Sequence, residues 1–315
     1  NDKVIAHDPE VNMLPRLTKK SVEYIDSRAG NEKPFFLYIP LGSPHTPIVP
    51  SPEWKGKSGL GEYGDFVMQT DNVVGEVSAA LERNGIADNT LVIFTSDNGC
   101  SKAADIKGLA EQGHIVSAQL RGSKADIWDG GHRIPFIVRW PGTVEAGTQN
   151  DQLICLTDLF ATVGEITGNE IPLASAVDSV SFLPALSGEP IQSTRNGVIH
   201  HSFSGHFAYR QGPWKLILAR GSGGWSSPNE IEAMKKDWPK AQLYHMQKDI
   251  GEENNLYDAK PEIAEKLLGL LESDVAKGRS TEGPEASNDV PREEIVLWKS
   301  EGEKKRKSKG KKKEK

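Results

Sequence analysis

Apolar residues recur at helical spacing in four segments of the chain. In the clearest, 63–85, Phe66, Val73 and Leu81 fall on one face of the helix that the spacing predicts. A second helix is predicted behind a Thr18 cap. The four predicted helices cover residues 17–30, 63–85, 157–168 and 261–278.

Short continuous apolar runs alternate with the first three of these helices. Runs at 34–41 and 90–99 have the length and composition of strands buried on both faces, and 135–142 is a further strand. Alternating strands and helices are typical of an α/β domain. We therefore predict an α/β fold over residues 1–190, with a mixed, mostly parallel sheet flanked by helices.

The pattern changes near residue 190, where strands begin to follow one another directly. Apolar runs at 197–203, 207–219 and 242–246 precede the helix predicted over 261–278. This order predicts a smaller carboxyl-terminal domain over 191–285, an antiparallel sheet with a helix on one side. Residues 286–315 are expected to form a disordered basic tail.

Charge is divided unevenly along the chain. Lys304–Lys315 holds nine basic residues and one acidic residue, which leaves 29 basic and 43 acidic residues and a net charge of −14 elsewhere. An acidic globular part is a poor nucleic-acid binder, so no nucleic-acid partner is expected. Two cysteines exclude a disulfide scaffold, and no apolar stretch reaches the ~18 residues of a membrane span. Composition leaves the oligomeric state open.

Polar residues end two of the predicted strands, at the sheet edge where α/β proteins bind ligands. His45 lies between Pro44 and Pro47, which restrict its backbone. Asp97 and Asn98 supply oxygen donors of the kind that hard cations prefer. Taken singly, His45 is equally consistent with a loop histidine, and Asp97-Asn98 with a turn.

A third polar segment, 120–136, is rich in glycine and cations. Arg121, Lys124, His132 and Arg133 precede the strand predicted at 135–142. Lysine and arginine on a loop suit an anionic substrate, although the segment alone also fits a solvated loop. Together with His45 and the Asp97-Asn98 pair, it indicates a site for an oxyanion ester.

These segments resemble the sulfatases of the alkaline phosphatase superfamily. FFLYIPLGSPHTP is similar to the family segment that bears an active-site histidine, and TLVIFTSDNG to its metal-binding strand end. LRGSKADIWDGGHRIPFIVRWPG resembles the segment with the sulfate-contacting lysine. Later segments such as DSVSFLPALSG and FAYRQGPWKLI also match, and the resemblance extends from about residue 33 to 258.

The resemblance implies an arylsulfatase-like sulfuric ester hydrolase. By position, Asp97 and Asn98 would be calcium ligands, His45 would face the bridging ester oxygen, and Lys124 would contact a sulfate oxygen. His132, Arg133 and His201 are weaker candidates for substrate binding; Arg133 could instead pin its loop through a carboxylate. The implied partner is a sulfated small molecule or glycan, and the implied location is secreted or periplasmic.

The chain departs from the family at the nucleophile. Family members use a formylglycine made from Cys or Ser in a Cys/Ser-x-Pro/Ala-x-Arg context, and neither Cys100 nor Cys155 lies in one. We expect the formylglycine and the other metal ligands in a segment amino-terminal to Asn1. The chain by itself is accordingly predicted to be inactive.

Two other functions remain open from the sequence. One is a phosphate-ester or phosphonate hydrolase of the same superfamily. The other is a non-catalytic protein that binds sulfated polymers through its basic tail. Of the aromatic residues, Trp128, Trp140 and Trp214 suggest carbohydrate stacking, but we expect at least two of them to pack in a core.

Overall fold

The computed structural model describes residues 7–192, 194–291 and 294–298. The chain divides into two compact units, the first formed by residues up to 118, 133–152 and 183–191, the second by 119–132, 153–182 and 192 onward. The segment carrying Lys124 therefore belongs with the carboxyl-terminal sheet. The sequence analysis predicted one boundary near residue 190, whereas each of these units is made of several separate segments. The limits of the predicted domains stay a prediction. The Lys304–Lys315 tail lies outside the described residues.

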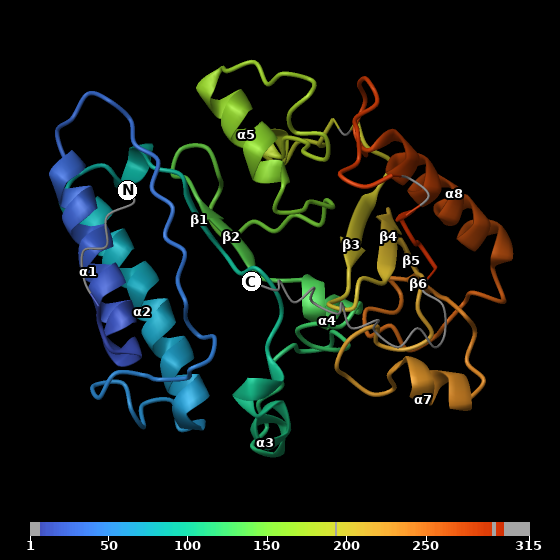
Figure 1. Ribbon diagram of the computed structural model, residues 1–315. Helices are drawn as coiled ribbons and strands as arrows, with labels where there is room; N and C mark the ends of the chain where they lie inside the picture. The colour runs from blue at the N-terminus through green and yellow to red at the C-terminus, as the bar shows by residue number, and fades with distance from the viewer. Residues whose placement is uncertain (1–6, 193, 292–293, 299–315) are drawn as a thin grey trace, which may run out of the picture. The chain divides into compact units, whose positions relative to one another are not determined.

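The first unit is built on two packed helices, α1 (Glu10–Arg28) and α2 (Gly61–Arg83) (Figure 1). Their apolar stripes meet at Ile25 and Leu81, which are buried. The prediction for α2 is confirmed, whereas α1 begins eight residues earlier than Thr18. Thr18 is not a cap, because its hydroxyl donates to the Leu14 carbonyl within the helix. The shorter elements of this unit are η1 (Ala87–Asn89), η2 (Lys102–Ala104), α3 (Ile106–Glu111) and α6 (Leu183–Leu186).

Residues 34–41 are extended but are not a strand, so this prediction is wrong. Phe35 and Leu37 pack against the α1–α2 core, while Phe36 and Tyr38 are 77% and 75% exposed. The alternation is that of a strand, but a strand requires ladder hydrogen bonds to a neighbour. In the described part of the chain no segment pairs with it.

The sheet of the first unit consists of β1 (Val92–Thr95) and β2 (Phe136–Arg139), paired antiparallel with Val92 opposite Arg139. Both strands were predicted. The mostly parallel sheet is not confirmed, because both sheets among the described residues are antiparallel. Apolar runs predict burial of a strand but not the direction of its neighbour, which depends on distant chain segments.

The second unit contains a four-stranded antiparallel sheet in the order β3-β4-β5-β6. An antiparallel sheet was predicted here, but from three apolar runs, of which 207–219 forms two strands. Helix α8 (Pro261–Lys277) packs against β4 and β5 (Figure 1). The strands are β3 (Val198–His201), β4 (Phe207–Gln211), β5 (Trp214–Ile217) and β6 (Gln242–His245). The remaining helices are α4 (Asp129–His132), α5 (Asp158–Thr167) and α7 (Glu230–Lys235).

Both faces of this sheet are buried. Tyr209 and Leu216 point toward the cluster that includes α8, and their neighbours Ala208 and Ile217 belong to a cluster with Trp128. Successive residues of a strand face opposite sides, so each strand contributes to both cores. The segment after Lys124 thus covers one face of the sheet. Trp128 is buried and Trp214 packs against the α8 cluster, which confirms a core role for two of the three tryptophans.

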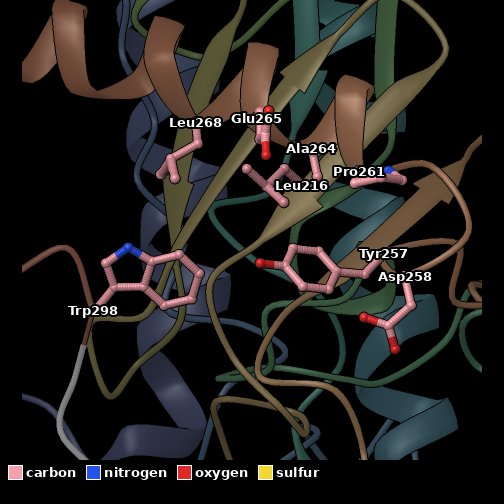
Figure 2. A pocket seen from close by; sticks show the side chains of 8 residues that line it. All are labelled: Leu216, Tyr257, Asp258, Pro261, Ala264, Glu265, Leu268 and Trp298. Carbon is pink, nitrogen blue, oxygen red and sulfur yellow. The ribbon is translucent and has the colours of Figure 1, made fainter.

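Two hollows lie in the second unit. One, beside α8, has a volume of about 120 Å³. Figure 2 shows side chains that line it, among them Tyr257, Trp298 and Leu216. Another, of about 340 Å³, includes His206 and Lys240 in its lining. Neither is lined by a residue predicted for the active site. Among the described helices, none is long and apolar enough to cross a membrane.

Candidate active site

Lys124 lies on a tight turn, residues 123–126, which we call the Lys124 turn. The Asp126 backbone N–H donates to the Ser123 carbonyl at 3.0 Å. Ala125 has a φ of 79°, in the left-handed region that favours glycine. A non-glycine residue persists in this conformation only when its surroundings enforce it.

The side chain of Asp126 holds Ala125 in this left-handed conformation. Its carboxylate is fully buried and accepts hydrogen bonds from the Ser123 N–H at 2.8 Å and from the N–H groups of Trp225 and Ser226 at 2.8 and 2.9 Å. The hydroxyls of Ser123 and Ser226 also donate to it. A buried carboxylate is tolerated only when its oxygens are paired in this way. Asp126 therefore joins the Lys124 turn to a loop 99 residues later.

The two glycines after Trp128 allow α4 to pack directly on the Lys124 turn. A Cβ on Gly130 would lie 2.3 Å from the Gly122 carbonyl oxygen, and one on Gly131 would lie 2.5 Å from the Asp126 carbonyl oxygen. No side chain fits at these distances. Close backbone contact thus explains why glycines occupy both positions.

A buried ion cluster fixes the start of α4 to the sheet. Lys215 of β5 is 0% exposed, and its Nζ lies 2.7 Å from Asp129 Oδ1 and 2.8 Å from Glu252 Oε1. Glu252 Oε2 accepts the Asp129 backbone N–H at 2.6 Å. Burial raises the pKa of Glu252, and Lys215 opposes that change.

His132 and His200 lie together on the same side of the sheet, with ring centroids 4.5 Å apart. The carbonyl of Asp126 bonds His132, that of Ile127 bonds His200, and the Nε2 atom of each ring is buried without a hydrogen-bond partner. Burial lowers the pKa of His132 to about 4, and Lys215 lowers it further. The pKa of His200 is also lowered well below its ordinary value by burial. Both rings are neutral at pH 7.

We expect the folded chain to lose stability in mild acid because of these two histidines. The unfolded chain takes up a proton on each near pH 6.5, whereas folded His132 resists it until about pH 4. Stability should therefore fall as pH drops below 6.5, by about 2 kcal/mol for His132 alone between pH 7 and 5. Urea unfolding at both pH values measures this loss.

The variant His132→Leu is the comparison. It should lose less stability than the parent chain between pH 7 and pH 5, because one titrating ring is gone. Equal losses in both proteins would assign the acid sensitivity to other groups.

The remaining candidate of the second unit, His201, ends β3 and is exposed. Its ring packs edge-on against Phe207 at a centroid distance of 4.1 Å. Phe207 packs against the α8 cluster, so His201 lies on the opposite face of the sheet from its neighbour His200. His200, rather than His201, is the β3 residue whose ring contacts His132.

The first unit carries His45, Asp97, Asn98 and Arg133. Asp97 and Asn98 lie in the loop directly after β1, and His45 is exposed with its Nδ1 2.8 Å from the Thr46 carbonyl oxygen. Arg133 is exposed and has no ion pair with another described residue. The alternative role, in which Arg133 holds its loop by binding a carboxylate, is therefore not supported. Within the described residues no hydrogen bond joins His45 to Asp97 or Asn98. The roles of all seven residues stay predictions.

Sequence reasoning missed the residues that hold the site. Asp126, Lys215 and Glu252 are charged groups in positions that a sequence assigns to turns or strands, and only their burial reveals their role. A signal existed for Lys215, because a lysine inside the run WKLIL is unusual in a buried strand. No comparable signal marks Asp126 or Glu252.

Comparison with known proteins gives sulfatase-related matches across residues 14–277 of the chain. Residues 14–169 match the family described as sulfatase, and residues 123–277 match that described as N-sulphoglucosamine sulphohydrolase, C-terminal. An N-acetylgalactosamine-6-O-sulfatase of Bacteroides thetaiotaomicron is 35% identical over 82% of this chain and 50% of its own length. Human steryl-sulfatase is 32% identical over 60% of this chain and 32% of its own length.

Solved structures agree in fold. One from work on glycosaminoglycan metabolism by Bacteroides thetaiotaomicron has a TM-score of 0.74 and 33% identity, covering 85% of this chain and 55% of that one. A Pseudoalteromonas sulfatase has a TM-score of 0.71 at 22% identity, covering 88% and 56%. The chain spans half or less of the length of these curated relatives.

Proposed function

This chain belongs to the sulfatase family, and from that premise we propose that it serves in the hydrolysis of a sulfate ester to an alcohol and sulfate. The observation that carries the proposal is the Lys124 turn. Its lysine is placed by a buried carboxylate and by two glycines that admit no side chain. Such support is what an anion-contacting ammonium group requires to be preorganised.

Asp97 and Asn98 fit a hard cation such as calcium. The Asp97 carboxylate is exposed and has no hydrogen bond or ion pair with another described residue. The Asn98 Nδ2 donates to the Gly99 carbonyl at 3.2 Å, which leaves Oδ1 as the free acceptor. The two residues would supply part of a ligand set, since the described residues contain no group of three or more His, Cys, Asp or Glu able to hold a metal. Bound calcium would offset negative charge on the sulfuryl group.

His45 is suited to moving a proton at the bridging ester oxygen. Its Nδ1 lies 2.8 Å from the Thr46 carbonyl oxygen and 3.2 Å from the Thr46 hydroxyl. The carbonyl can only accept, so it favours the tautomer in which Nδ1 carries the hydrogen. Nε2 is then the acceptor in the neutral ring and the donor in the protonated ring. Lys124 would neutralise a sulfuryl oxygen while the leaving alcohol takes the proton.

The residues present do not fit formylglycine. Cys100 bonds Tyr63 at 3.3 Å, Cys155 lies beside Thr157, and neither has the required sequence context. We also propose that β1 belongs to a larger, mostly parallel sheet.

We expect this chain to bind sulfate without hydrolysing sulfate esters. With calcium present, no release from an aryl sulfate is expected, because a nucleophile is needed to form the covalent intermediate. Sulfate binding, measured by calorimetry, should weaken about tenfold or more in Lys124→Ala, since a charge-assisted hydrogen bond is lost.

Lys266→Ala is the matched control, an exposed lysine on α8 of the same unit, and should bind sulfate like the parent. Measurable hydrolysis by this chain would contradict the assignment of the nucleophile. Equal sulfate affinity in both lysine variants would refute the proposed function. Loss of retention on a sulfated resin only when 304–315 are deleted would assign binding to the tail.

A further inference from the structure

Two aromatic side chains of the second unit are exposed side by side. Phe203 follows β3 and Trp225 lies in the loop between β5 and α7, with ring centroids 5.3 Å apart and tilted by 56°. Phe203 is 72% exposed and Trp225 is 43% exposed. Large apolar rings gathered at a surface commonly mark a binding site. We call these two residues the aromatic pair.

The backbone of each member is bonded to the Lys124 turn. The Phe203 N–H donates to the Ala125 carbonyl at 2.9 Å, and the Trp225 N–H donates to Asp126 Oδ1 at 2.8 Å. Gly224 adjoins the same turn, because a Cβ there would lie 2.2 Å from the Ala125 carbonyl oxygen. Two loops, far apart in sequence, are thus held against the residues that directly follow Lys124.

This arrangement selects a ligand with an anion at one end and a partly apolar ring at the other. In such a ligand the anion would pair with the Lys124 ammonium, and the ring would stack on an aromatic face. The rings form an open surface, so the outer face of the ligand remains in water. A pyranose fits, because its C–H face can stack while its hydroxyls stay hydrated, whereas a sterol would leave a large apolar area exposed.

We propose that Phe203 and Trp225 form the platform for the sugar ring of a sulfated saccharide whose sulfate is held by Lys124. The proposal rests on the proposed function and specifies its substrate class. It assigns specificity to two residues that the sequence analysis did not select as candidates. It also gives Asp126 a second role, the placement of Trp225 relative to Lys124.

Calorimetry with two probes, inorganic sulfate and N-acetylgalactosamine 6-sulfate, tests this inference on the full chain with calcium. The sugar sulfate should bind more tightly than sulfate. Trp225→Ala and Phe203→Ala should each weaken the sugar sulfate about three- to tenfold and leave sulfate within about twofold. Trp225→Phe should recover part of the loss. Phe160→Ala, an exposed ring on α5, is the control and should change neither affinity.

The outcomes separate the two levels of the inference. If Lys124→Ala weakens both probes but the aromatic variants weaken neither, the platform is wrong and the proposed function stands. If Lys124→Ala affects neither probe, the proposed function fails and the platform fails with it. If a steroid or aryl sulfate gains more from the aromatic pair than the sugar sulfate, the saccharide class is wrong. Thermal unfolding of each variant verifies that it is folded.

Discussion

Replacing Lys215 with methionine is expected to lower the free energy of unfolding by about 3 to 5 kcal/mol. Lys215 is fully buried between the carboxylates of Asp129 and Glu252, at 2.7 and 2.8 Å. Methionine matches its length but leaves two buried acids facing each other without a cation. Arg210, 3.7 Å from Asp129, offsets only part of that charge. Urea unfolding monitored by circular dichroism measures the loss.

Two comparisons make the Lys215 result specific. Lys19→Met removes an exposed lysine 3.8 Å from Glu23 and should change stability by less than about 0.5 kcal/mol. Adding Glu252→Gln to Lys215→Met should restore part of the loss, because one of the two orphaned acids becomes neutral. A loss below about 1 kcal/mol in Lys215→Met would show that the buried acids are already protonated without the lysine.

The variant Asp126→Asn is expected to lower stability by about 2 to 4 kcal/mol and to weaken sugar-sulfate binding. Asparagine keeps the shape, and its single oxygen can still accept the N–H groups of Trp225 and Ser226. Its amide nitrogen then faces the Ser123 N–H, which places a donor against a donor. The Lys124 turn should loosen, with Ala125 no longer held in its left-handed conformation.

Stability and binding report different consequences of Asp126→Asn. Urea unfolding gives the lost free energy, and calorimetry gives the affinities for sulfate and the sugar sulfate. The exposed Asp88→Asn, in η1, is the matched control and should alter neither property. If Asp126→Asn unfolded like the parent, the hydrogen bonds to Asp126 would contribute no net stability, and it would not hold the turn.

Local patterns in the sequence were sufficient for the longer helices and for most of the strand-forming runs, but they did not predict the short helices α3, α4, α6 and α7. The stripes in α2, α5 and α8 and the runs in β1, β2 and β4–β6 depend on residues within a few positions of one another. Such spacing shows which face of a helix or strand is buried in the folded protein. It failed at 34–41, where the alternation was present but a pairing strand was not found among the described residues.

The same contrast between local patterns and distant contacts applies to the candidate site residues. His45, Asp97, Asn98 and Lys124 were selected as candidates because each follows a recognisable run or lies in a glycine-rich segment. Their supports were not found. Asp126 and Trp225 are 99 residues apart, and Lys215 and Asp129 are 86 apart.

Local spacing and motif order were enough to predict a sulfatase-like α/β segment followed by an antiparallel sheet and a helix. Tertiary structure alone decided that Ile127 and Trp128 cover the second face of the sheet and that a buried carboxylate joins the Lys124 turn to the aromatic pair. Burial and hydrogen bonding between distant residues arise only when the chain has folded, and they change what a charged residue does. A sequence shows that Asp126 is an acid, but only the fold shows what it holds.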